Sequence, residues 1–276
     1  MDIWMKRFLI GLVILMIVGL VGYRFLTPAE FRAQANPAPV CQSAAFDKSA
    51  LVFDTLLICG TNQVSAEKLT HAANVAAEWL DNDEDGQVDE PRLLTALKEN
   101  NPVVLMTGSG ISARAIPTLL PLIQGRSSQD LSAAETNPAG ERRDASQEEI
   151  HHIIMNAGWI PLFPATFSDQ ANQNSTLYQA WKIADDNQHY VYNDPTCNDS
   201  CKVTEFVYLA TAAYMETGAE KDLASDEMRL NTRAELGQAI PSVIEIFESN
   251  EYLYPTNHWP DGTYPFPANI EIYDGP

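Results

Sequence analysis

The stretch that decides the fold is residues 65–92, SAEKLTHAANVAAEWLDNDEDGQVDEPR, in which a helical pattern runs directly into an acidic loop. Its apolar residues recur at the helical period, at positions 69, 72, 73, 76 and 80. Ser65 is a typical N-cap residue and stands just before that pattern. The sequence therefore predicts a helix from Ser65 to about Leu80, followed at once by a loop over residues 81–92.

The loop carries carboxylates at alternate positions, which is the arrangement that lets side-chain oxygens converge on one cation. Gly86 follows the third carboxylate and permits a sharp turn that a Cβ would obstruct. Three alternating Asp residues followed by Gly resemble the start of an EF-hand calcium loop. The predicted ligands are four carboxylates, the last of them direct or through water, and one backbone carbonyl: Asp81, Asp83, Asp85, Asp89 and Gln87, respectively.

The resemblance to EF-hand loops ends after the ninth position. The twelfth position of such a loop holds a bidentate Glu, whereas this chain has Arg92 there, directly after Pro91. Glu90 is the alternative ligand if the loop closes early. We therefore expect weak calcium binding of the kind that suits calcium-rich surroundings. The competing interpretation is an acidic, solvated loop between two helices.

Residues 1–36 predict an export segment. Lys6 and Arg7 precede the almost wholly apolar residues 8–23, as in a secretory signal peptide or a single signal anchor. The apolar stretch is short for a membrane span, which needs about 20 residues, and residues 33–35 offer a cleavage site. Both alternatives place residues 37–276 in the periplasm or outside the cell. Contact with a membrane is expected only through this segment, if it stays uncleaved.

The four cysteines fit an exported chain, because an even number of cysteines in an oxidising compartment indicates disulfides. The pairing of neighbours in the sequence is Cys41 with Cys59 and Cys197 with Cys201. Metal binding by the thiols is the alternative, but one CxxxC spacing without a second pair is a weak signal. The net charge of −20 argues against nucleic acid and anionic membrane surfaces as partners.

Residues 37–276 are numerous enough for a single domain with its own core, and 45% of the chain is hydrophobic. We expect a mainly α (α+β) fold, a single helical domain with a small β element. Residues 51–58 and 102–107 are predicted strands, residues 124–143 a surface loop, and residues 251–276 irregular structure. The predicted helices beyond residue 91 are 92–99, 146–157, 175–187, 203–217, 231–238 and 241–250.

A second possible metal site begins at Glu148-Glu149-Ile150-His151-His152. Glu148 and His152 are four apart and share one helix face. This pattern resembles the HExxH helix of zincin metalloproteases, with the first His replaced by Glu. The resemblance implies Glu148, His152 and Glu205 as metal ligands, Glu149 as general base and His189 as a spare ligand. Such a ligand set is harder than that of zincins and favours manganese, iron or calcium alongside zinc.

Helix capping is the structural alternative for these acidic residues. Ser146-x-x-Glu149 matches a capping box. Thr204 is a possible N-cap, which would place Glu205 in a first turn where the helix dipole favours negative charge. A further alternative is the ExxH half-motif of di-iron bundles, Glu149 to His152, although that architecture needs two such motifs.

The chain as a whole is similar to a group of uncharacterised exported proteins with an EF-hand-like calcium loop and a variant zincin-like EExxH helix. The similarity is carried by four segments: Leu80–Gly86, Glu148–His152, Thr196–Glu205 and Pro260–Gly262. It implies export and transfers no activity.

Two hypotheses follow from the sequence. The first is an exported calcium-binding protein with a zincin-like metallohydrolase site, peptidase-like and in variant form, that acts on a protein or peptide. The second is a non-enzymatic, calcium-stabilised surface or periplasmic protein that binds a surface partner or a glycan. They are distinguished by whether Glu148, His152 and Glu205 converge within ligand distance of one point.

Overall fold

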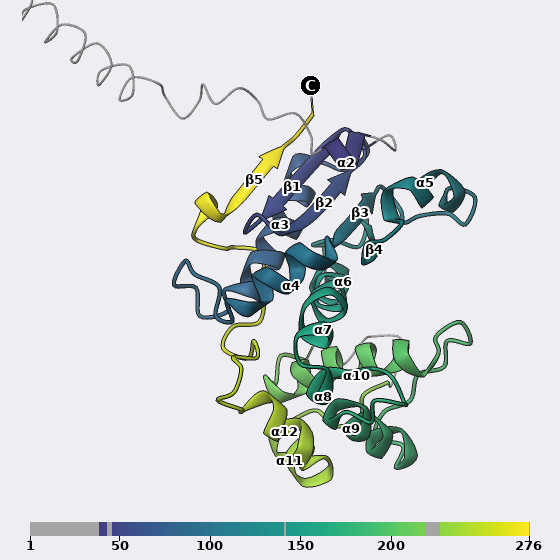
Figure 1. Ribbon diagram of the computed structural model, residues 1–276, viewed down its shortest axis with the longest axis vertical. Helices are drawn as coiled ribbons and strands as arrows, with labels where there is room; N and C mark the ends of the chain where they lie inside the picture. Colours follow the sequence, from purple (N-terminus) through teal and green to yellow (C-terminus); the bar gives the residue numbers. More distant parts are fainter. Residues whose placement is uncertain (1–38, 43–45, 141, 219–226, 276) are drawn as a thin grey trace, which may run out of the picture. The chain divides into compact units, whose positions relative to one another are not determined.

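The structure of the protein is a computed structural model that describes residues 39–42, 46–140, 142–218 and 227–275 (Figure 1). The predicted export segment, residues 1–36, lies outside the described residues. In the part of the chain that is described, no helix has the length and apolar character needed to cross a membrane. Contacts between Cα atoms group residues 37–276 into one compact unit.

Five strands of the described chain form one mixed sheet with the order β4-β3-β2-β1-β5 (Figure 1). Antiparallel pairs join β1 to β2 and to β5, and parallel pairs join β3 to β2 and to β4. The strands are β1 Lys48–Val52, β2 Leu56–Gly60, β3 Val103–Thr107, β4 Ser128–Ser132 and β5 Ile270–Tyr273. The predicted strand 102–107 is therefore confirmed as β3, and the β element is larger than predicted.

Three of the sequence predictions about strands are wrong. The apolar stretch 51–58 is two strands, because the chain reverses at Phe53 and Asp54, whose φ angles are 47° and 54°. The Thr55 backbone N–H donates to the Val52 carbonyl and closes this turn. The predicted loop 124–143 contains β4, and the predicted irregular tail contains β5.

The helices largely follow the predicted pattern, and the fold is α+β. The long helices are α3 Ala66–Leu80, α4 Arg92–Asn100, α5 Ile116–Ile123, α6 Ala145–Ile154, α9 Thr176–Asp186, α10 Asp199–Tyr214, α11 Arg233–Ala239 and α12 Pro241–Phe247. A π-helix at Met155–Trp159 continues α6. The short helices are α2 Pro39–Gln42, α7 Ile160–Leu162, α8 Pro164–Phe167 and the 3-10 turn Pro267–Asn269. Ser65 caps α3 as predicted, accepting the backbone N–H of Lys68.

Apolar side chains fill both faces of the sheet. Leu56 and Ile58 of β2 point into the larger core, which also contains residues of α3, α6 and α10. Leu57 and Cys59 point to the opposite face, where they pack with residues of β3 and α5. This alternation is the period expected of a strand buried on both sides. Because both faces are covered, the sheet serves as a rigid base for the helices.

The four cysteines form the two predicted disulfides, Cys41–Cys59 and Cys197–Cys201, with Cα atoms 5.4 and 5.3 Å apart. The first joins α2 to β2 and lies in the smaller core. The second closes the segment that leads into α10. No free cysteine is present among the described residues, so none of them offers a thiol for metal binding.

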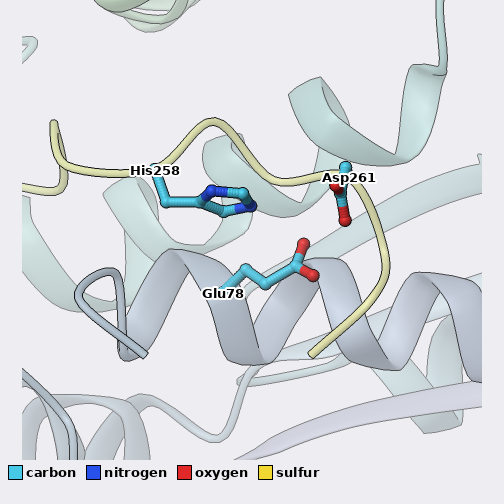
Figure 2. A group of neighbouring side chains, drawn as sticks. All are labelled: Glu78, His258 and Asp261. Carbon is cyan, nitrogen blue, oxygen red and sulfur yellow. The ribbon is translucent and has the colours of Figure 1, made fainter. Parts of the chain in front are cut away.

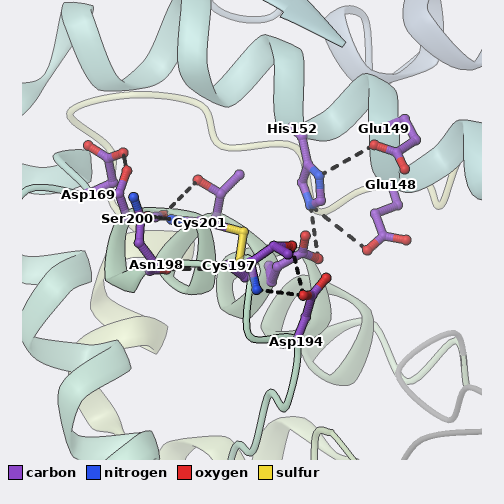
Figure 3. The surroundings of a disulfide bond; sticks show 12 residues. Glu148, Glu149, His152, Asp169, Asp194, Cys197, Asn198, Ser200 and Cys201 are labelled. Atoms are coloured by element: carbon purple, nitrogen blue, oxygen red, sulfur yellow. Dashed lines mark hydrogen bonds and ion pairs between the residues drawn. A yellow bond between two sulfur atoms is a disulfide. The ribbon is translucent and has the colours of Figure 1, made fainter. Parts of the chain in front are cut away.

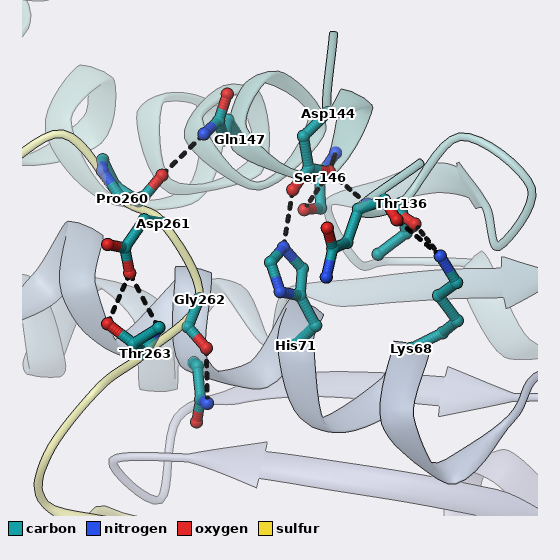
Figure 4. Close-up of polar contacts among 12 residues, drawn as sticks. Lys68, His71, Thr136, Asp144, Ser146, Gln147, Pro260, Asp261, Gly262 and Thr263 are labelled. Atoms are coloured by element: carbon teal, nitrogen blue, oxygen red, sulfur yellow. Dashed lines mark hydrogen bonds and ion pairs between the residues drawn. The ribbon is translucent and has the colours of Figure 1, made fainter. Parts of the chain in front are cut away.

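Polar contacts fix α6 against α3, and Figure 4 shows the one between His71 and Asp144. His71 Nε2 lies 2.6 Å from Asp144 Oδ2, and the Trp79 indole N–H donates to the Gln147 carbonyl over 2.9 Å. Burial opposes the charge of Asp144, yet hydrogen bonds from His71, Ser146 and the backbone hold its pKa below the ordinary value. The helix that carries the EExxH pattern is therefore held by the helix that ends in the acidic loop.

Candidate metal sites

The described residues contain three groups of side chains whose ligand atoms lie within 4.8 Å of one another. We call them the helix cluster (Glu148, His152, Glu205), the loop cluster (Asp81, Asp83, Asp85) and the tail cluster (Glu78, His258, Asp261). The sequence predicted the members of the first two. Carboxylate and imidazole groups in such arrangements can hold a metal ion.

The capping box predicted at the start of α6 does not form, although Glu148 lies in the first turn, where the helix dipole favours its negative charge. The N-cap of α6 is Asp144, whose carboxylate accepts the backbone N–H of Ser146 at 3.0 Å. Glu149 does not reach back to Ser146 and instead accepts a hydrogen bond from Gln129 of β4. The predicted capping box is therefore wrong, because α6 begins two residues earlier than that motif requires.

The capping explanation also fails for Glu205. α10 begins after Asn198, whose side chain accepts the Cys201 backbone N–H at 3.0 Å. Thr204 therefore lies inside the helix, and its hydroxyl donates to the Ser200 carbonyl. Glu205 lies in the second turn, beyond the orphan N–H groups of the first turn. Its inward position thus needs another explanation.

The helix cluster brings its three side chains to one buried point, as Figure 3 shows for Glu148 and His152. His152 Nε2 lies 3.5 Å from Glu205 Oε2 and 4.0 Å from Glu148 Oε1. The His152 side chain is 6% exposed, and its Nε2 has no hydrogen-bond partner among the described residues. A buried ring nitrogen without a partner is costly, so this atom is suited to an additional ligand.

Glu149 lies on the other side of the same ring. Its Oε2 is 3.8 Å from His152 Nδ1, and the carboxylate is 28% exposed (Figure 3). A histidine that binds metal through one nitrogen usually presents the other to a carboxylate, which fixes the tautomer and the ring orientation. Glu149 therefore lies where an orienting carboxylate would stand, and the general-base role that the zincin resemblance implied stays a prediction.

The charges of the helix cluster are strongly perturbed. Burial opposes the charge of His152, but the carboxylates of Glu149, Glu205 and Glu148 outweigh it and raise the pKa of His152 to about 9. Burial, together with the adjacent Glu148 carboxyl, raises the pKa of Glu205 to about 8 despite the opposing charge of His152. Protons are thus held here at neutral pH, and a bound cation would displace them.

His151, the neighbour of His152, has a different environment. It is fully buried among aromatic rings, 5.0 Å from Trp79 and 5.6 Å from Tyr208 between ring centroids. Its Nε2 is 2.9 Å from the Tyr254 hydroxyl. Burial, with the nearby charge of His152, lowers the pKa of His151 well below its usual range, so the ring is neutral. His151 therefore belongs to the core, and only His152 faces the cluster.

Two buried tyrosines that interact electrostatically with Glu148 of the helix cluster were not foreseen from the sequence. The hydroxyls of Tyr190 and Tyr208 are buried and have no hydrogen-bond partner among the described residues. Burial raises the pKa of both, and the charge of Glu148 adds to each shift. Both hydroxyls therefore stay protonated and can donate a hydrogen bond to an anionic oxygen. No sequence period marks Tyr190, which lies in a segment between helices.

The spacing of the helix cluster fits a small cation. Metal bonds of about 2.0–2.2 Å in a tetrahedral site place neighbouring donor atoms about 3.3–3.6 Å apart. The distance of 3.5 Å from His152 Nε2 to Glu205 Oε2 lies in this range. The distance of 4.0 Å from His152 Nε2 to Glu148 Oε1 is slightly longer than the range. Arg143 forms an ion pair with the other oxygen of Glu148 and fixes its orientation. A four-coordinate ion held by these three residues would keep one coordination position for another ligand.

The loop cluster shows the hydrogen bonding of a tightly wound loop. The carboxylate of Asp81 accepts the backbone N–H groups of Asp85 at 3.1 Å and Gly86 at 2.9 Å. Gly86 has φ of 92°, which favours glycine as the sequence predicted. Asp81 is buried, whereas Asp83 and Asp85 are exposed. The first three predicted calcium ligands thus face one another around a turn that keeps them together.

The remaining predicted ligands of the loop are less closely grouped. Asp89 lies outside the loop cluster, and the predicted role of the Gln87 backbone carbonyl stays a prediction. Burial, together with the charge of Asp83, raises the pKa of Asp89 to about 6, and its Oδ1 is buried without a partner in the described chain. Glu90 is held by Arg92, whose guanidinium donates to both carboxylate oxygens. Glu90 therefore serves the helix start and not the loop cluster.

A cavity of about 500 Å³ borders the loop cluster. Its walls are the acidic side of the loop and the segment that follows α12, and the lining includes Asp83, Asp89, Tyr252, Tyr254 and Asn257. The helix cluster is not part of that lining. His189, the predicted spare ligand, belongs to none of the three clusters. The tail cluster had no signal in the sequence, because its members come from distant parts of the chain.

Comparison of the chain with protein-family models, with curated proteins and with solved structures finds no match. The similarity to exported proteins that the four sequence segments suggested therefore stays a prediction. Function has to be argued from the chemistry of the clusters.

Proposed function

We propose that the protein is an exported, metal-dependent hydrolase whose metal ion binds at the helix cluster. The observation that carries the proposal is the position of His152. Its Nε2 is buried, faces two carboxylates and lacks a hydrogen-bond partner in the described chain, while its Nδ1 faces Glu149. His151 also has a buried ring nitrogen without a hydrogen-bond partner, Nδ1, so what distinguishes His152 is the carboxylates that face it.

Each residue of the helix cluster has a distinct part in this proposal. Glu148, His152 and Glu205 hold the ion, and Glu149 orients the imidazole. An ion in such a site activates water and polarises a carbonyl group. The hydroxyls of Tyr190 and Tyr208 donate hydrogen bonds to the negative charge that develops on the substrate oxygen, which is a large contribution to catalysis of this class. Peptides and related carbonyl compounds are therefore the substrates that we expect.

The ligand set makes zinc one of several candidate metals. Two carboxylates and one imidazole are suited to zinc, manganese and iron, and the harder donors shift preference toward the last two. The paired cysteines are typical of oxidising surroundings, where the protein would meet calcium as well. The proposal thus places the protein in the periplasm or outside the cell, with calcium at the loop cluster.

Metal content tests this proposal, measured by elemental analysis of the full chain after dialysis against buffered zinc, manganese and excess calcium. The Glu148→Ala/His152→Ala double variant is compared with His189→Ala, which changes a histidine outside the clusters. We expect one transition-metal ion to be lost in the double variant and retained in the control, with hydrolysis of a peptide library lost in parallel. Equal metal content in all three proteins would disprove the site.

A second candidate function is favoured by the cavity. It borders the loop cluster, and its walls combine carboxylates with Tyr252, Tyr254 and Asn257. Pockets of this size bind small ligands, so a calcium-stabilised binding protein without catalysis is the alternative. Calcium-dependent binding of a glycan in the Glu148→Ala/His152→Ala variant, with no hydrolysis by the unmodified protein, would favour that alternative.

A further inference from the structure

The tail cluster lies where the C-terminal part of the chain crosses α3. Glu78 projects from α3 and is fully buried, whereas His258 and Asp261 belong to the irregular segment that follows α12. Figure 2 shows the carboxylates of Glu78 and Asp261 facing each other, with the imidazole ring of His258 beside them. One ligand atom from each residue lies within 4.8 Å of the others.

Backbone hydrogen bonds already fix the two carboxylates. Glu78 Oε1 accepts the Thr263 N–H at 2.6 Å, and Oε2 accepts the Gly262 N–H at 2.9 Å. Asp261 Oδ1 accepts both the N–H and the hydroxyl of Thr263, at 3.0 and 2.6 Å. Each carboxylate oxygen has a second lone pair, so these contacts orient the groups and leave them able to bind a cation.

The histidine is held in the same way. The Asn82 side chain accepts the His258 backbone N–H at 3.1 Å and donates to the His258 carbonyl at 2.6 Å. The Nε2 atom of His258 is buried and has no hydrogen-bond partner in the described part of the chain. Its nearest carboxylate outside the cluster is Glu84, whose Oε1 is 3.9 Å away. That distance is too long for a hydrogen bond.

Two carboxylates and one imidazole are brought together in the tail cluster. Capping of the turn by Glu78 explains why that residue is buried there. It does not explain why a second carboxylate and an unpartnered imidazole nitrogen are directed at the same place.

We propose that Glu78, His258 and Asp261 form a second site for a divalent transition-metal ion, separate from the helix cluster. One nitrogen and two oxygen donors are a ligand set suited to zinc or manganese, and oriented carboxylates are what such a site requires. The ion would join α3 to the C-terminal segment. Two of its ligands come from a segment without helix or strand. The ion would fix that segment in place, so its proposed role is structural.

Zinc counting in the full-length, disulfide-bonded chain tests the site, with calcium in excess to occupy the loop cluster. The single variants are His258→Ala and His152→Ala, and the double variant combines these two changes. The unmodified chain and the control His189→Ala are measured beside them. We expect two zinc ions in the unmodified chain and the control, one in each single variant and none in the double variant. Zinc should raise the melting temperature of His152→Ala and leave that of the double variant unchanged.

The count separates the two proposals. If His152→Ala retains all the zinc of the unmodified chain while His258→Ala loses it, the tail site stands and the helix site fails. If His258→Ala retains the unmodified count, the tail site is refuted. Asp261→Asn covers the case in which His258→Ala does not fold, because it keeps the shape of the side chain and removes its charge. An unchanged zinc affinity in that variant would also overturn the proposal.

Discussion

Glu149 is the residue for which the sequence and the structure suggest different roles, so its substitution is the most informative. As a general base it would be needed for hydrolysis and not for metal binding. As the residue that orients His152, it would be needed for both. Glu149→Gln removes the charge and keeps an acceptor for the ring N–H, whereas Glu149→Ala removes both.

The magnitude follows from the position of the carboxylate. Its Oε2 lies 3.8 Å from His152 Nδ1, and the side chain is 28% exposed. Removal of an orienting carboxylate typically weakens metal binding by about 10–100-fold, which equals about 1.4–2.8 kcal/mol. We expect Glu149→Ala to reach the upper part of this range and Glu149→Gln the lower part.

The assay is a competition titration of zinc against a chelator of known affinity, with calcium in excess and with peptide hydrolysis followed in parallel. Glu67→Gln and Glu67→Ala are the matched controls, because Glu67 is an exposed acid on α3 that belongs to no cluster. The controls should bind zinc like the unmodified chain. If both Glu149 variants keep full zinc affinity and lose hydrolysis, the orienting role is refuted and the general-base role is restored.

Two further predictions concern stability. Asp83→Ala should lower the melting temperature in calcium and scarcely change it in a chelator, because the side chain is exposed and its contribution comes through the cation. Thermal unfolding in both buffers measures this. An equal drop in melting temperature in the two buffers would contradict calcium binding. Gly262→Ala should cost at least about 2 kcal/mol of unfolding free energy, measured in urea. The residue has φ of 82°, and a Cβ there would come within 2.2 Å of the His71 ring; a change within error would show that the C-terminal segment is not held against α3.

Local patterns accounted for the parts of the structure that depend on neighbours in the sequence. The helical period and the Ser65 cap predicted α3, and alternating aspartates predicted the turn that follows it. The failures are equally specific. Phe53 with a positive φ is an uncommon choice for a turn, so nothing in the stretch 51–58 indicated a reversal. β4 is mostly polar, and its parallel pairing with β3 identifies it as a strand.

The helix cluster was predictable in part, for the same reason. Glu148 and His152 share a face because they are four apart, which any helix guarantees. Whether Glu205 would meet them depended on where α10 begins, and the sequence pointed to Thr204 when the true cap is Asn198. The role of Glu149 depended on which ring nitrogen it would face, a detail that spacing cannot supply.

One segment without regular secondary structure connects all three clusters. The Tyr254 hydroxyl contacts His151, beside the helix cluster, and the Tyr264 hydroxyl donates to Asp81 of the loop cluster at 2.5 Å. Between these residues, the segment supplies two members of the tail cluster. Irregular chain holds its shape through such contacts and not through a hydrogen-bonded ladder. Cations at the loop and tail clusters would therefore fix the same segment that packs behind His152, which gives metal binding a direct influence on the helix that carries the proposed hydrolase site.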